Sequence, residues 1–158
     1  MNKFYSPALS SAYTAQSRWS GFLFGFGLVA FLDEVVFHQL LHWHHFYDKS
    51  TKDIGLVSDG LLNSMAGFAI IFSLFLLADF RRRHLMDWKF WIGHVLMGMG
   101  TFQLFDGTIN HKVFGIHQIR YVDNLIVYDI IWLIVAVLLL IIGFIIGKRG
   151  SNESSHAS

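Results

Sequence analysis

Cysteine is absent from this chain, and proline occurs once, at Pro7. Without thiols the protein has no disulfide, no thiolate metal site and no cysteine nucleophile. Charged residues are also scarce, at 15% against about 25% in soluble proteins. A net charge of +1 gives no electrostatic basis for binding nucleic acid. The chain is instead 54% hydrophobic and 16% aromatic, and its 158 residues suffice for one domain.

Four apolar stretches reach the length of about 20 residues that a transmembrane helix needs. They cover residues 19–43, 60–78, 88–108 and 125–146. The first is not a cleavable signal peptide, because its apolar run is too long and no small-residue cleavage site follows it. The sequence therefore predicts an all-α fold, a four-transmembrane-helix bundle over residues 19–147. Residues 1–18 are expected to form a cytoplasmic segment and residues 148–158 a disordered cytoplasmic tail.

Lysine and arginine are unevenly divided between the two sides of the predicted bundle. One side holds Lys3, Arg18, Arg81, Arg82, Arg83, Lys89, Lys148 and Arg149, and the other holds Lys49, Lys52, Lys112 and Arg120. Because basic residues favour the cytoplasmic side, this asymmetry places both termini in the cytoplasm. The protein is thus expected to be a multi-pass cell-membrane protein whose opposite end faces the periplasm or the cell exterior.

Histidines and carboxylates gather at that outer end, where ionisable groups are costly and usually functional. On the first helix His38, His42 and His45 follow Glu34 at the spacing of one helical face. On the same predicted helix, Asp33 and His44 project from a different side. Since Asp33 and Glu34 lie side by side toward the bilayer centre, they cannot both be bare anions.

The other three predicted helices each bring a carboxylate into the same layer. The second begins near Ser58 and Asp59, and one of these is expected to be its N-cap, which leaves a carboxylate oxygen of Asp59 free to bind. The third carries Gln103, Asp106 and Asn110 on one face, followed by His111 and His117, and the fourth carries Asp129. Carboxylates and imidazoles meeting at one level of a helical bundle are typical of metal sites.

We therefore predict a transition-metal site near the outer membrane face that serves redox chemistry or metal handling. Its expected ligands are His38, His42, His45, Asp106, His111, Asp129 and His117. Residues expected to orient these ligands or to handle protons are Asp33, Glu34, Gln39, His44, Asp59, Asn63, Gln103 and Asn110. Imidazole and carboxylate ligands suit copper, zinc or iron. The sequence decides neither among these metals nor whether the site is catalytic.

Three alternatives remain open. In a proton or cation transporter subunit, Asp33, Glu34 and Asp129 would form a relay, but the inner half of each helix is nearly uncharged. In a b-type haem protein His38 would need an axial partner, and His94 lies too near the inner side. In a purely structural protein the polar groups would bond only one another, at a gain of about 0.6 kcal/mol per bond.

The chain also resembles a family of small bacterial membrane proteins, catalogued as domain of unknown function twenty-two forty-three. The resemblance covers residues 20–146 and is carried by Gly25-Phe26-Gly27, Asp33-x4-His38-Gln39-x3-Trp43-His44-His45, Ser58-Asp59-Gly60-Leu61 and Phe102-x3-Asp106-Gly107-x2-Asn110-His111-x3-Gly115-x-His117-x2-Arg120. The family commonly has a histidine in place of Asn63 and a glutamate in place of Asp106. It is also found joined to an assembly factor of copper-containing cytochrome oxidases, which implies copper.

The expected partners follow from composition and from this resemblance. The lipid bilayer is the first, and a respiratory-oxidase or metal-handling protein is the second. Glycine pairs such as Gly21-x3-Gly25 allow close helix contact, so a homo-oligomer is left open. No nucleic-acid partner is expected.

Overall fold

The structure, a computed structural model, describes residues 7–156, and the side chains of residues 13–150. The described residues form four long helices: α1 (Pro7–Asp33), α2 (Lys52–Arg82), α3 (Trp88–Phe105) and α4 (Leu125–His156). Two π-helical segments, η1 (Glu34–Leu40) and η2 (Asp106–Val113), continue α1 and α3. No strand occurs among the described residues, so the all-α prediction is confirmed.

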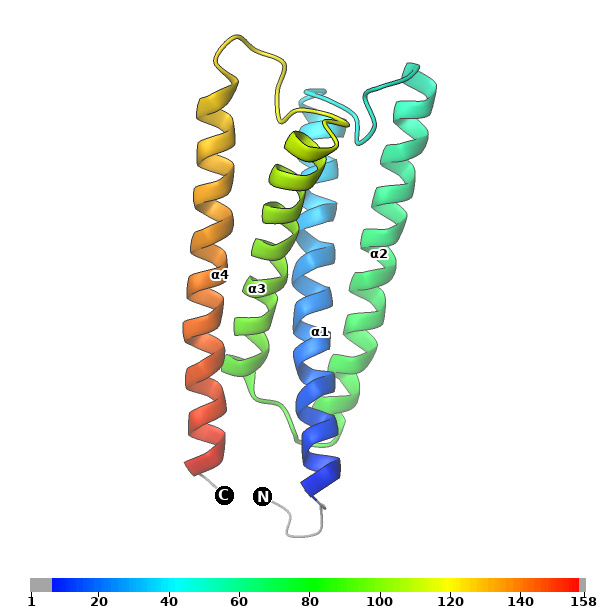
Figure 1. Ribbon diagram of the computed structural model, residues 1–158. Helices are drawn as coiled ribbons and strands as arrows, with labels where there is room; N and C mark the ends of the chain where they lie inside the picture. The colour runs from blue at the N-terminus through cyan, green and yellow to red at the C-terminus, as the bar shows by residue number, and fades with distance from the viewer. Residues whose placement is uncertain (1–6, 157–158) are drawn as a thin grey trace.

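The helices lie side by side in the order α2, α1, α3, α4 (Figure 1). α1 and α3 form the centre of this row, with α2 packed on α1 and α4 packed on α3. Among the described residues α2 makes no contact with α4, so the helices form an open row and not a closed ring. α1 begins and α4 ends at the same end of the row, and the loops after η1 and η2 cover the opposite end (Figure 1).

Small residues allow the central helices to approach closely. A Cβ atom on Gly25 of α1 would overlap the carbonyl oxygen of Val95, and one on Gly98 of α3 would overlap that of Phe22. α1 is also tied to α2 by a reciprocal pair of buried hydrogen bonds, because Ser20 and Ser73 each donate a hydroxyl to the other's carbonyl oxygen. The glycine contacts fix the register of α1 against α3, and the serine pair fixes that of α1 against α2.

Within the part of the chain that the structure describes, three helices are long and apolar enough to cross a membrane, namely Tyr13–Leu40, Lys52–Arg82 and Leu125–Gly150. Only 11% of the apolar window of the second and 22% of that of the third are buried inside the protein. Such surfaces need a lipid environment, which agrees with a multi-pass membrane protein. α3 was predicted as a fourth span but is not among the three, and its 18 residues include the polar side chains of Lys89, His94 and Gln103.

The second helix starts eight residues earlier than the sequence suggested. Thr51, not Ser58 or Asp59, is its N-cap, and the Thr51 hydroxyl accepts a hydrogen bond from the Ile54 N–H at 3.4 Å. The expectation that Ser58 or Asp59 caps this helix is therefore wrong. Asp59 lies inside α2, where its carboxylate is free to bind groups from outside the helix.

A candidate metal centre

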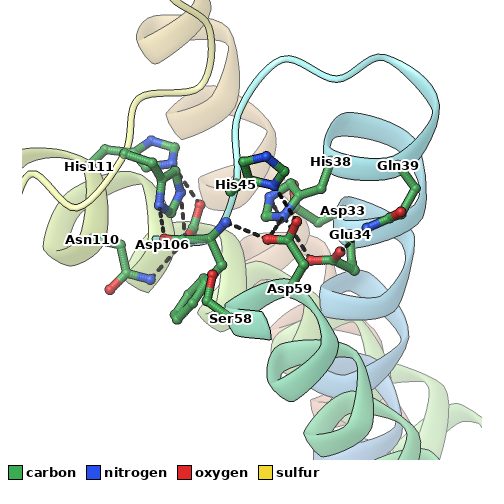
Figure 2. A network of polar contacts seen from close by, with 12 residues as sticks. Asp33, Glu34, His38, Gln39, His45, Ser58, Asp59, Asp106, Asn110 and His111 are labelled. Carbon is green, nitrogen blue, oxygen red and sulfur yellow. Dashed lines mark hydrogen bonds and ion pairs between the residues drawn. The ribbon is translucent and has the colours of Figure 1, made fainter. Parts of the chain in front are cut away.

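The ionisable residues predicted at the outer end converge where η1, η2, α2 and the loop after η1 meet (Figure 2). Each π-helical segment begins with a buried carboxylate, Glu34 in η1 and Asp106 in η2. A π turn holds one residue more than an α turn, so it re-aims the side chains that follow, and such turns are frequent at functional sites.

One group of ligand-type atoms consists of Asp106, His111 and His117, all fully buried. His111 Nε2 lies 2.9 Å from His117 Nε2 and 2.9 Å from Asp106 Oδ2. His117 Nε2 is 3.6 Å from Asp106 Oδ1. The three side chains thus direct nitrogen and oxygen atoms at one another, with room for one small centre among them.

The hydrogen bond made by His117 Nδ1 determines whether His117 Nε2 carries a proton. His117 Nδ1 lies 2.8 Å from the carbonyl oxygen of Phe46, and a carbonyl oxygen only accepts, so Nδ1 carries a proton. In the neutral ring Nε2 is then unprotonated and presents a lone pair to His111 and Asp106. A backbone carbonyl that fixes the tautomer in this way is the usual partner of a metal-binding histidine.

A second group surrounds His38. His38 Nδ1 lies 2.7 Å from Glu34 Oε2 and 3.0 Å from Asp59 Oδ1, and the contact with Asp59 has hydrogen-bond geometry. His38 Nε2, on the opposite edge of the ring, has no hydrogen-bond partner and is 3.7 Å from Asp33 Oδ2. His45 Nδ1 contacts the other oxygen of Asp59 at 2.6 Å. Glu34, His38 and Asp59 form the second cluster of ligand-type atoms in the described part of the chain.

The backbone of Phe46 connects the two groups. Its N–H donates to Asp59 Oδ1 at 2.7 Å, and its carbonyl accepts from His117 Nδ1. The neighbouring Tyr47 N–H donates to the Ser58 hydroxyl on α2, which holds this loop in place. The loop therefore carries both hydrogen bonds of Phe46 at fixed positions relative to α2.

Each leading carboxylate is held by an amide from its own π segment (Figure 2). Gln39 donates to Glu34 Oε1 at 2.9 Å, and Asn110 donates to Asp106 Oδ1 at 2.9 Å. These are the positions that an orienting role requires, since one carboxylate oxygen is fixed and the other is left for a ligand contact.

His44 lies between the two groups and is buried. Its ring stacks on His117 with centroids 4.6 Å apart and meets the ring of His38 edge-on at 4.4 Å. Burial, together with the neighbouring imidazoles, lowers the pKa of His44 to about 2. The ring is therefore neutral at physiological pH, and its buried Nδ1 has no hydrogen-bond partner.

Two predicted ligands lie apart from these groups. η1 ends at Leu40, so the helical stripe through His42 does not continue, and His42 is exposed with a left-handed φ of 50°. Asp129 forms an ion pair with Lys112 instead of meeting the histidines. Asn63 and Gln103 each have a buried side-chain oxygen without a hydrogen-bond partner.

Helical-wheel reasoning gave Asp33 and His44 only supporting roles, and a second signal in the sequence was missed. The spacing Asp33-x4-His38-x5-His44 recurs as Asp106-x4-His111-x5-His117. Because the second copy forms a converging group in the structure, the first copy marks Asp33 and His44 as its counterparts. A search for internal repeats finds this pattern without any structure.

Fold and site together define a helical membrane protein with a buried histidine and carboxylate cluster at one end of its helices. The chain belongs to the family described as "Predicted membrane protein (DUF2243)", which it matches over residues 20–150. The family resemblance seen in the sequence is thereby confirmed. No curated protein and no solved structure matches the chain.

Proposed function

We propose that this protein binds a transition metal ion between Asp106, His111 and His117, near the extracytoplasmic face of the membrane. The observation that carries the proposal is the approach of two imidazole nitrogens to 2.9 Å beside a buried carboxylate. Metal–nitrogen and metal–oxygen bonds to zinc are about 2.0–2.2 Å, so two ligands of one ion lie at most about 4 Å apart. The three distances in this group, 2.9, 2.9 and 3.6 Å, fall within that limit.

A hydrogen-bonded cluster without metal accounts for these atoms less well. His117 Nε2 and Asp106 both accept, so His111 Nε2 can offer its single proton to only one of them. A cation that accepts all three lone pairs removes this conflict.

The ligand chemistry favours copper, zinc or iron, because two imidazoles and one carboxylate suit these ions and no thiolate is present. A redox-active ion with an open coordination position would support redox chemistry, and a loosely held ion would support metal delivery or storage. The family's link to copper oxidase assembly supports copper and a respiratory-oxidase or metal-handling partner.

The placement at the outer face rests on charge. Arg81, Arg82 and Arg83 end α2 at the end of the helices remote from the cluster. Under the positive-inside rule that end is cytoplasmic. The cluster then lies at the end of the helices that faces the periplasm or the cell exterior, so a metal ion would reach it without crossing the bilayer.

The direct test is elemental analysis of protein purified in mild detergent without a metal-affinity tag. We expect copper, zinc or iron to co-purify, and His111→Gln to remove at least one ion per chain. His84→Gln is the matched control, because His84 is exposed at the other end of the helices. Wild-type protein that is free of metal and fails to bind any of the three ions on titration would overturn the proposal. A Soret band in the optical spectrum would support haem in its place.

A further inference from the structure

The two halves of the chain repeat each other with a spacing of 73 residues. This spacing separates Asp33 from Asp106, His38 from His111 and His44 from His117. It also separates Gly25-x-Gly27 from Gly98-x-Gly100. The second helices of the two halves, α2 and α4, begin at Lys52 and Leu125, again 73 residues apart. Each half is thus a helix, a π segment, a loop and a second helix.

The glycine contacts show that the halves are related by an approximate two-fold axis. Gly25 meets the carbonyl of Val95 and Gly98 meets that of Phe22, and Phe22 and Val95 are themselves equivalent positions. The second glycine of each pair instead approaches the second helix of its own half: Gly27 meets the carbonyl of Ala66, and Gly100 meets that of Ala136. Reciprocal contacts of this kind are what a two-fold interface requires.

The histidine rings obey the same symmetry. The rings of His38 and His44 are 4.4 Å apart at 66°, and those of His111 and His117 are 4.5 Å apart at 77°. Between halves, His38 is 6.2 Å from His117, and His44 is 6.3 Å from His111. The parallel stack of His44 on His117 joins two equivalent residues, and so it lies at the axis.

We infer that Asp33, His38 and His44 form a second metal site, equivalent to Asp106, His111 and His117, so that each chain holds two transition metal ions. The inference rests on the proposed function, since it assigns to the first half the ligand set proposed for the second. The two sites meet at the stacked pair of His44 and His117, which makes one centre with a ligand set of two aspartates and four histidines.

In the described part of the chain Asp33, His38 and His44 converge less closely than Asp106, His111 and His117, but each has a buried ligand-type atom without a hydrogen-bond partner. His38 donates from Nδ1 to Asp59, so in the neutral ring Nε2 presents its lone pair on the Asp33 side. The 3.7 Å between His38 Nε2 and Asp33 Oδ2 leaves space for an ion at about 2 Å from each. Asp33 Oδ1, His38 Nε2 and His44 Nδ1 are all buried without a hydrogen-bond partner.

The carboxylates of Glu34 and Asp59 then support the second site and do not bind the ion themselves. They contact the Nδ1 edge of His38, remote from Asp33, as a carboxylate does behind a metal-binding histidine. The equivalent positions in the other half are Gly107 and Trp132, and there His111 Nδ1 has no partner. The two sites therefore have equivalent ligands, but only the site in the first half has carboxylates beside the Nδ1 atom of its histidine.

The test is metal stoichiometry of the full chain in detergent, for the wild type and for the matched variants His44→Gln and His117→Gln. Zinc or copper is titrated into metal-free protein by calorimetry. We expect two equivalents for the wild type, one for each variant, and none for the double variant. His42→Gln is the control, because the equivalent position in the other half is Gly115, which has no side chain to bind a metal.

The outcomes separate this inference from the proposed function. Wild-type protein that binds no metal overturns both. One equivalent that survives in His44→Gln but is lost in His117→Gln overturns only the second site, and two equivalents that survive in His44→Gln assign the second ion to Glu34, His38 and Asp59. Should the variants fail to fold, spin coupling between two Cu(II) ions in the wild type provides an independent readout, and an uncoupled single-ion spectrum at saturation counts against the inference.

Discussion

At the scale of the residue, the asymmetry behind His38 and His111 predicts unequal affinities. A carboxylate behind a histidine raises the basicity of the ligand, and removing such a partner typically weakens metal binding about 10- to 100-fold. We expect Glu34→Gln with Asp59→Asn to weaken one of the two binding steps by this factor and to change the other much less. Calorimetric titration resolves the two steps.

A control for that experiment is available on the same helix. Asp53 lies in the first turn of α2 and is exposed, so Asp53→Asn should leave both affinities unchanged. If the carboxylate variant weakens both steps equally, Glu34 and Asp59 act on the fold as a whole and not on His38.

Metal affinity should also depend on pH. An imidazole must be neutral to bind, so below about pH 6.5, its ordinary pKa, protons compete with the ion and affinity falls as pH falls. The expected loss is roughly tenfold per pH unit for each ligand imidazole that must release a proton. Zinc titrations between about pH 5 and 8 measure it. Affinity that stays constant over that range would contradict coordination by histidine.

At the scale of the element, the contact between α1 and α3 should tolerate no side chain. Gly25→Ala places a Cβ against the Val95 backbone, and overpacking of this kind costs typically about 1–3 kcal/mol. Because this contact fixes the register of the two halves, we expect weaker metal binding together with a lower melting temperature. Thermal unfolding in detergent and metal titration measure the two effects.

Gly67 supplies the matched control. It lies in α2, and a Cβ added there meets nothing within 4 Å. Gly67→Ala should therefore keep full metal binding and raise stability by up to about 1 kcal/mol, the helix propensity gained over glycine. Equal destabilisation by the two substitutions would show that the close approach of α1 and α3 is not what Gly25 provides.

The helices and π segments also show how much of the fold could be predicted from the sequence. Hydrophobic runs located all four helices, and the histidine clusters located the end at which the site forms. The wheel drawn for an α-helix correctly placed Glu34 beside His38, but it failed for His42, because η1 ends at Leu40. Local periodicity does not reveal a π segment. Asp59 was predicted to support the ligands, but its contact with the loop at Phe46 was missed, because Asp59 was also expected to cap the helix that Thr51 caps.

At the scale of the whole molecule, the proposed orientation can be tested directly because the chain has no cysteine. Lys49 lies in the loop beside the cluster and Arg82 at the other end of α2, and both are exposed. We expect Lys49→Cys to react with a membrane-impermeant maleimide in intact cells, and Arg82→Cys to react only after permeabilisation. The reverse labelling pattern would place the cluster on the cytoplasmic side.

The peptide of Phe46 has a consequence for how such a centre would fill. Its N–H holds Asp59, behind one half, and its carbonyl holds His117, in the other, so one rigid amide plane spans both. An ion that draws His117 toward itself would move this amide plane. Through the Phe46 N–H, the movement would also shift Asp59, which contacts His38. We therefore expect loading to be cooperative, with the first ion changing the affinity for the next through this peptide as well as through the stacked rings of His44 and His117.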